Sequence, residues 1–150
     1  GTLPQLLKDN FEEAPNRIAL RFKDLGIWKT YTWADYYEHV KALALGLVSL
    51  GAKTGDTVGI IGENQPPWYW GEIAIQALQG ICVGIFVDAV PSEIKYILEH
   101  SDASFVIAHD QEQVDKVLEI GRMVERIVGR RLRSEAINNG RIPKELKWNN

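Results

Sequence analysis

The stretch "GDTVGIIGENQPPWYW", residues 55–70, places glycines between a short apolar run and a predicted helix start. Many nucleotide-binding proteins carry a phosphate loop at such a junction. The dinucleotide fingerprint needs three glycines as G-x-G-x-x-G, whereas Gly59 and Gly62 are separated by two isoleucines. The Walker loop ends in Gly-Lys-Ser or Gly-Lys-Thr, and neither tripeptide occurs in the chain. We therefore interpret the stretch as a strand, a turn and a helix start, with Asn64 as N-cap before two prolines.

The alternation of apolar runs and helical patterns continues downstream. Strands are predicted at Thr57–Ile61, 81–87 and 104–108, and helices at 65–79, from Pro91, and after the capping pair Asp110 and Gln113. The runs "ICVGIFV" and "SFVIA" are apolar at nearly every position, which is typical of parallel strands buried on both faces. Strand, helix, strand, helix, strand, helix predicts βαβ units. The expected fold class is α/β, a parallel sheet with helices on both faces.

A helix and a β-hairpin are expected before this sheet. Residues 3–13 read as a helix with Leu3, Leu6, Leu7 and Phe11 on one face, and residues 18–33 as two strands joined by the turn "KDLG". Thr32 and Asp35 form a capping pair at the start of the next helix. Its inner face is predicted to hold Val40, Leu43, Ala44, Leu47, Val48 and Leu50, and Gly51 and Gly80 are predicted to end this helix and the 65–79 helix.

Composition and charge exclude several classes of protein. The chain has 150 residues, 45% hydrophobic and 25% charged, which suits one globular domain. Its net charge of −3 is too small to indicate a nucleic-acid partner, so none is expected. Residues 1–121 carry a net −8 (9 Lys/Arg, 17 Asp/Glu) and residues 122–150 a net +5 (8 Lys/Arg, 3 Asp/Glu). We expect an α/β domain over 1–121 and a basic segment of helix, over 122–133, and loop beyond it. The lone Cys82 favours a reducing, cytoplasmic setting.

No residue stands out as catalytic or metal-binding. His39, His100 and His109 are far apart, without the spacing of metal ligands, and no serine lies in a Gly-x-Ser-x-Gly elbow. We predict no catalytic, cofactor-binding or metal-binding residue in this chain. An alternative is a free-standing, flavodoxin-like nucleotide-binding domain with Asn64 and Asp88 near its crevice. A second alternative is an interaction module that binds an acidic partner through residues 122–147.

The ordered segments resemble the N-terminal portion of the adenylate-forming, AMP-binding superfamily, and within it long-chain acyl-CoA synthetases. The resemblance rests on "YTW" at residues 31–33, Gly-Asp before a strand at residues 55–58, and an Asn-x-Pro-x-Trp helix entry near residues 64–68. It rests also on a Pro-x-Glu helix start at Pro91, followed by Ile-Leu and Ser over residues 97–101. The resemblance covers about residues 2–120.

The resemblance implies an ATP-dependent reaction in two steps. A fatty carboxylate attacks ATP to give an acyl-adenylate and pyrophosphate, and the thiol of coenzyme A then displaces AMP. ATP, CoA, Mg²⁺ and a fatty acid are the cofactors and partners implied for the parent enzyme. The family's Ser/Thr/Gly-rich phosphate loop, its Thr-Glu motif, its ribose-binding Asp and its C-terminal lysine are absent here. We therefore expect an inactive fragment that binds none of these molecules alone.

Two further expectations concern association and location. A sheet that has lost its neighbouring subdomain would expose an apolar surface, so we expect self-association through an exposed sheet or apolar face. The expected location is the cytoplasm, with peripheral membrane contact through "WYW", residues 68–70, as the alternative.

Overall fold

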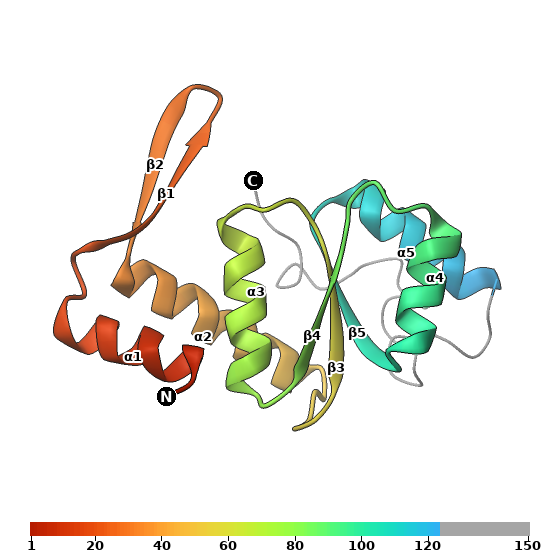
Figure 1. The fold of residues 1–150 in the computed structure, drawn as a ribbon, viewed down its shortest axis with the longest axis horizontal. Coiled ribbons are helices and arrows are strands. Elements are labelled where there is room, and N and C mark those ends of the chain that lie inside the picture. Colours follow the sequence, from red (N-terminus) through yellow and green to blue (C-terminus); the bar gives the residue numbers. More distant parts are fainter. Residues whose placement is uncertain (124–150) are drawn as a thin grey trace.

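A parallel sheet with the strand order β4–β3–β5 organises the computed structural model, which describes residues 1–123 (Figure 1). β3 (Thr57–Ile61) lies between β4 (Ile81–Ile85) and β5 (Ala103–Ala108). Thr57 is in register with Ile81 on one side and Ala103 on the other. All five residues of β3 are buried, as expected for a parallel strand covered on both faces.

Helices cover both faces of the sheet, which confirms the predicted fold class. α1 (Leu3–Glu13), α2 (Trp33–Ser49) and α3 (Pro66–Ala77) lie on one side, and α4 (Pro91–His100) and α5 (Gln111–Met123) on the other (Figure 1). Val58 and Ile60 of β3 pack into the core beneath α1, α2 and α3. Ile61 packs into the second core, beneath α4 and α5. Because side chains alternate along β3, this strand contributes residues to two separate hydrophobic cores.

The predicted hairpin forms from β1 (Ile18–Asp24) and β2 (Ile27–Thr32), which pair antiparallel and project away from the sheet (Figure 1). β2 ends at Thr32, where α2 begins. The Thr32 Oγ1 accepts a hydrogen bond from the Asp35 backbone N–H at 3.1 Å, and the Thr32 N–H donates to Asp35 Oδ2 at 2.8 Å. The predicted capping pair is confirmed in both directions.

Several residues predicted to be buried are exposed. Leu3 and Leu6 of α1 are 50% and 51% exposed, and Val48 of α2 is 48% exposed. The run 81–87 is not a strand buried on both faces, because β4 ends the described sheet and only Ile85 is fully covered. Helical or strand periodicity identifies the apolar face of an element but not whether another element covers it.

The end of α3 also differs from the prediction. The helix ends at Ala77, and Gln79, rather than Gly80, takes the left-handed conformation, with φ 57°. Gly80 is required for a different reason, because a Cβ there would lie 2.9 Å from the Asp56 carbonyl oxygen. Gly51, at φ 91°, does end α2 in the left-handed conformation as predicted.

The basic helix predicted over 122–133 and the loop beyond it lie outside the described residues, apart from the last two residues of α5. Within residues 1–123, no helix is both long and apolar enough to cross a bilayer.

The cap of α2 yields a stability prediction. Thr32→Ala removes the acceptor for the Asp35 N–H, so we expect the free energy of unfolding to fall by about 1 kcal/mol in urea titrations. Thr30→Ala, at an exposed position of β2, is the matched control and should change it less. Equal losses in the two variants would contradict a capping role for Thr32.

The same cap predicts a pH dependence. The hydrogen bonds from Thr32 to Asp35 lower the pKa of the Asp35 carboxyl below its usual value. A carboxyl with a lowered folded-state pKa stabilises the fold above its unfolded-state pKa and loses that contribution as the pH falls. We therefore expect the stability difference between the native chain and Asp35→Asn to shrink in acid, measured by urea unfolding at a series of pH values. A difference that grows in acid would contradict this assignment.

Candidate functional site

The stretch at residues 55–70 includes β3, the loop after it and the start of α3. Gly59 lies inside β3, where a Cβ would lie 3.0 Å from Leu98 Cδ2 and 3.4 Å from Ile85 Cδ1. This glycine therefore makes room for side chains that pack on the sheet. The loop itself is closed by the Gln65 side chain, which donates to the Glu63 carboxylate at 2.7 Å. The Gln65 backbone N–H donates to the Glu63 carbonyl oxygen at 2.8 Å, and the Glu63 carboxylate places negative charge in the loop, which opposes the binding of a phosphate.

The prediction that Asn64 caps α3 is wrong. The N-cap position is Gln65, which makes no side-chain capping bond, and Asn64 instead accepts a hydrogen bond from the Tyr69 hydroxyl at 2.5 Å. The two prolines at the start of α3 explain the difference. Proline has no backbone N–H, so the first turn presents fewer donors for a side chain to cap.

Two hollows open at the end of the sheet where the parallel strands finish. The first, which we call the hairpin hollow, has a volume of about 400 Å³ between the hairpin, the start of α3 and the end of β5. It is lined by Phe22, Asp24, Leu25, Lys29, Tyr31, Gln65, Pro66, Pro67 and His109. Its position between the ends of β3 and β5 is the switch point of the strand order, where ligands bind in many open α/β sheets.

The charged groups of the hairpin hollow are engaged with each other. Lys29 Nζ lies 2.6 Å from Asp24 Oδ2, and the His109 backbone N–H donates to the Ile61 carbonyl oxygen at 2.8 Å. The ion pair is half exposed and joins the two strands of the hairpin. The residues that line the hollow include no serine, threonine or cysteine, and its one lysine is paired with Asp24.

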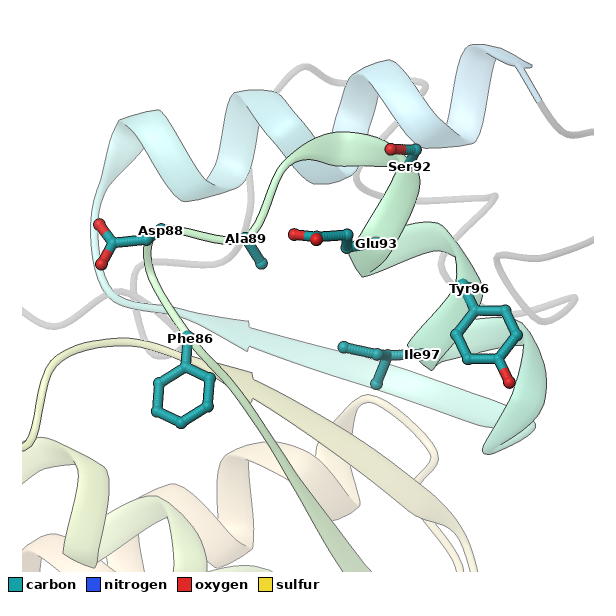
Figure 2. A pocket seen from close by; sticks show the side chains of 7 residues that line it. All are labelled: Phe86, Asp88, Ala89, Ser92, Glu93, Tyr96 and Ile97. Carbon is teal, nitrogen blue, oxygen red and sulfur yellow. The ribbon is translucent and has the colours of Figure 1, made fainter.

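The second hollow, which we call the β4 hollow, has a volume of about 700 Å³ between the loop after β4 and α4. Figure 2 shows its lining residues: Phe86, Asp88, Ala89, Ser92, Glu93, Tyr96 and Ile97. Asp88 points away from Tyr96 and Ile97 in this view. The Glu93 carboxylate accepts a hydrogen bond from the Val90 N–H at 3.1 Å and so serves the first turn of α4. The remaining walls are mostly apolar.

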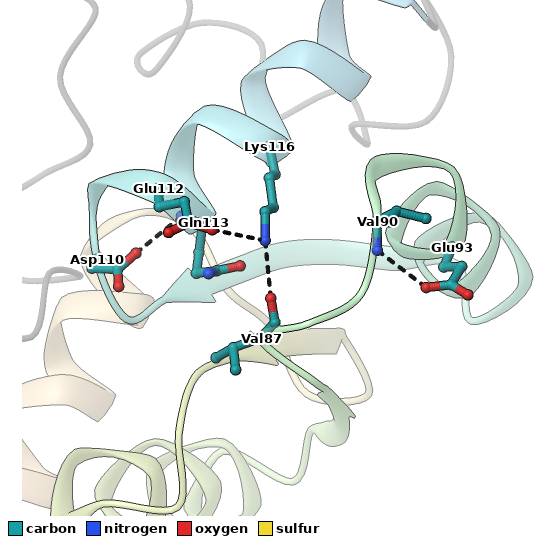
Figure 3. Close-up of polar contacts among 7 residues, drawn as sticks. All are labelled: Val87, Val90, Glu93, Asp110, Glu112, Gln113 and Lys116. Atoms are coloured by element: carbon teal, nitrogen blue, oxygen red, sulfur yellow. Dashed lines mark hydrogen bonds and ion pairs between the residues drawn. The ribbon is translucent and has the colours of Figure 1, made fainter.

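A lysine from α5 holds the rim of the β4 hollow (Figure 3). Lys116 Nζ donates to the Val87 carbonyl oxygen at 2.9 Å and lies 3.1 Å from Glu112 Oε1. Asp110 caps α5 as predicted, accepting from the Gln113 N–H at 3.0 Å. The contact between Lys116 and Val87 spans 29 positions and carries no local sequence signal, so sequence analysis did not predict it.

The residues proposed for the flavodoxin-like alternative are not brought together. Asp88 lines the β4 hollow, whereas Asn64 lines neither of these two hollows. Among the described residues, no group of three or more His, Cys, Asp or Glu side chains is placed to hold a metal ion.

The histidines are likewise separate. His39 stacks on Trp70 with ring centroids 3.8 Å apart, and burial lowers the pKa of its imidazole. His100 stacks on Tyr96 on α4, and His109 lies in the hairpin hollow. Each histidine has its own local setting, and the described structure does not assemble them into one site.

Cys82 lies in β4, half-buried against the core beneath α3. Burial raises the pKa of its thiol to about 11, with the nearby Glu72 carboxylate adding to the effect. The thiolate is the nucleophilic form of cysteine, so the raised pKa keeps this thiol in the less reactive protonated form at neutral pH. Cys82 is therefore a packing residue rather than a nucleophile.

The chain is similar to known proteins over most of its length. The family model for AMP-binding enzymes matches residues 7–147. A long-chain-fatty-acid–CoA ligase of Mus musculus, ACSBG2, is 29% identical over 117 residues, which are 78% of this chain and 18% of that protein. The chain thus spans about a fifth of the length of this curated relative. The family match runs beyond residue 121, and the predicted domain boundary there stays a prediction.

Solved structures agree in fold. A structure named as a long-chain-fatty-acid CoA ligase from Rhodopseudomonas palustris superimposes with a TM-score of 0.70 at 26% identity, covering 83% of this chain and 30% of that one. The N-terminal subdomain of NpsA from Klebsiella oxytoca gives 0.64 at 24% identity, covering 73% of this chain and 28% of that one. The described fold is therefore that of an N-terminal subdomain in this group of proteins.

The protonated state of Cys82 can be measured directly, because it is the only cysteine in the chain. A pKa raised from 9.0 to about 11 lowers the thiolate fraction about a hundredfold at pH 8. The higher nucleophilicity of a more basic thiolate offsets about tenfold of this. We expect a disulfide reagent to react with the folded chain at least about tenfold more slowly than with the urea-unfolded chain. N-acetylcysteine in the same urea gives the reagent control, and equal rates in the folded and unfolded chains would contradict the shift.

Proposed function

The chain belongs to the family of AMP-binding enzymes, and from this membership we propose that it is the N-terminal scaffold part of an ATP-dependent long-chain acyl-CoA synthetase. The parent enzyme joins a fatty carboxylate to AMP with release of pyrophosphate. It then transfers the acyl group to the thiol of coenzyme A with release of AMP. Fatty acid, ATP and CoA are its substrates, and the cytoplasm, with or without peripheral membrane contact, is the proposed location.

One observation carries this proposal. The family match spans most of the chain, and the curated relative matched at 29% identity is named for ligation of long-chain fatty acids to CoA. The matched structure from Rhodopseudomonas palustris bears the same kind of name at 26% identity. The proposal extends this named activity from the relatives to the parent of this chain.

The loop after β3 does not fit a site for Mg²⁺ and ATP. The loop after β3 contains Glu63 and no lysine, and its polar side chains bond to each other. A magnesium nucleotide site needs carboxylate or hydroxyl oxygens together with phosphate-binding N–H groups or cations. We therefore assign no step of the reaction to residues 1–123. The role proposed for them is structural, as part of the folded N-terminal region of the enzyme.

The competing functions rest on weaker grounds. The flavodoxin-like alternative is compatible with the strand order, but Asn64 lines neither the β4 hollow, where Asp88 lies, nor the hairpin hollow. The interaction module depends on residues 122–147, which extend beyond the described residues. No described contact favours either function over the acyl-CoA synthetase.

The experiment compares two products of the natural gene. One is the 150-residue chain, and the other is translated from the reading frame continued past Asn150. We expect the longer product to catalyse palmitate-dependent ATP–pyrophosphate exchange and to form palmitoyl-CoA. We expect the 150-residue chain to catalyse neither reaction and to show no saturable binding of ATP in calorimetry. Acetate in place of palmitate is the control for long-chain specificity.

Two results would contradict this proposal. One is a reading frame that stops soon after Asn150 without encoding a Ser/Thr/Gly-rich loop ending in Pro-Lys-Gly. The other is saturable binding of ATP, AMP or flavin by the 150-residue chain, which would instead support the free-standing nucleotide-binding domain.

A further inference from the structure

The outer edge of β4 is unpaired within the described residues, because β4 ends the three-stranded sheet. The Ile81 N–H donates to the Asp56 carbonyl oxygen at 2.9 Å, on the side of β3. Backbone groups along a strand point alternately to its two neighbours, so those of Cys82 and Gly84 point away from β3. These groups form a row of donors and acceptors that another strand can use.

This edge lacks the features that usually prevent pairing with another chain. Natural edge strands carry lysines, prolines or bulges, whereas the run from Ile81 to Val87 has no charged residue and no proline. Its register with β3 is regular over all five residues of β4. The hairpin, by contrast, carries Arg21, Lys23 and Lys29 on its strands. β5, at the other end of the sheet, is also uncharged, but five of its six residues are buried and its register with β3 is irregular near Thr57. β4, with Ile81 and Gly84 exposed, is therefore the edge strand of this sheet that is more open to a partner strand.

Exposed apolar side chains continue this edge onto α4. Phe86 is 85% exposed, Tyr96 64%, Ile81 57% and Val90 51%. Phe86 and Tyr96 stand on two sides of the β4 hollow, with Ile97 between them in Figure 2. Ligand pockets combine apolar walls with a few converging polar groups. Here Asp88 lies on the side of the hollow away from Tyr96, and Glu93 already accepts from the Val90 N–H, so the apolar surface is better suited to protein than to a small polar ligand.

We propose that the β4 edge and the β4 hollow form a dimer interface with a second copy of this chain. The two β4 strands pair antiparallel about a two-fold axis, and the apolar side chains around the hollow of each copy pack against the other copy. This arrangement closes on itself, because each copy offers the same patch to its partner. It specifies the surface through which the chain associates with itself and does not depend on the proposed enzymatic role.

Charge and area both favour a second copy as the occupant. In an antiparallel pair, like charges directly opposite each other are destabilising, and the uncharged run from Ile81 to Val87 can pair with itself without that penalty. With about 200 Å² for a whole aromatic side chain, the exposed parts of Phe86 and Tyr96 amount to roughly 300 Å² per copy. Ile81, Val90 and the paired backbones bring two copies to roughly 1,000 Å², near the lower limit for a specific interface.

The test is sedimentation velocity of the 150-residue chain over a dilution series from about 100 μM to about 1 μM. We expect dimer at the high end and dissociation on dilution. The double variant Ile81→Lys with Phe86→Lys should sediment as a monomer throughout, because it places charges on both copies along the same edge. The matched control, Leu45→Lys with Leu25→Lys, changes two leucines that are 59% and 96% exposed on α2 and in the hairpin turn, and it should still dimerise.

Amide hydrogen exchange tests the strand pairing itself. The N–H groups of Cys82 and Gly84 should exchange at least about tenfold more slowly at high than at low concentration of the native chain, and the variant Phe86→Lys, confirmed as folded by circular dichroism, should lose this difference. A native chain that is monomeric at every concentration overturns the proposal. So does association that survives in the Ile81→Lys, Phe86→Lys chain or that is lost equally in the control, and so does exchange that is independent of concentration.

Discussion

The burial of β3 on both faces and along both edges is the constraint on which the rest of the described structure depends. Parallel strands cannot be joined by a tight turn, so each connection from β3 to β4 and from β4 to β5 must cross a face of the sheet as a helix. Because the strands on either side of β3 are reached in this way, α3 and α4 take opposite faces. Gly59, at the middle of β3, lets Leu98 of α4 approach the strand closely. One strand thus fixes the layers and brings the loops that line both hollows to the same end of the sheet.

Element positions were predictable because their signals are local. Thr32 with Asp35, the prolines that open α3 and α4, and Gly51 each act through their own neighbours in the chain. The burial of each strand and helix by its neighbours was not predictable in this way. The apolar runs of β3 and β4 look alike in sequence, yet β3 is buried and β4 is largely not, since coverage depends on which other segments are present.

In the candidate site, too, the features with local sequence signals could be predicted, and those that depend on distant segments could not. The absence of a phosphate-loop pattern could be recognised from residue types, and the structure places the Glu63 carboxylate in the loop after β3, where it accepts from the Gln65 side chain. The position of Asn64 was misjudged because two consecutive prolines remove the donors that a capping side chain would use. The tie between Lys116 and Val87, and the two hollows, arise from contacts between distant segments, which no short pattern encodes.

Thr32 ends β2 and caps α2, so the hairpin joins the helix with no linker between them. Two further hydrogen bonds secure this junction, from Trp33 N–H to the Arg17 carbonyl oxygen and from Ala34 N–H to the Pro15 carbonyl oxygen, both at 3.0 Å. The hairpin is therefore joined directly to the first turn of α2 by the chain and by hydrogen bonds. We expect that a movement of the hairpin that changes the width of the hairpin hollow would either break hydrogen bonds of the first turn of α2 or move α2 with the hairpin. The width of the hairpin hollow therefore depends on the position of α2, whose inner face is buried in the core.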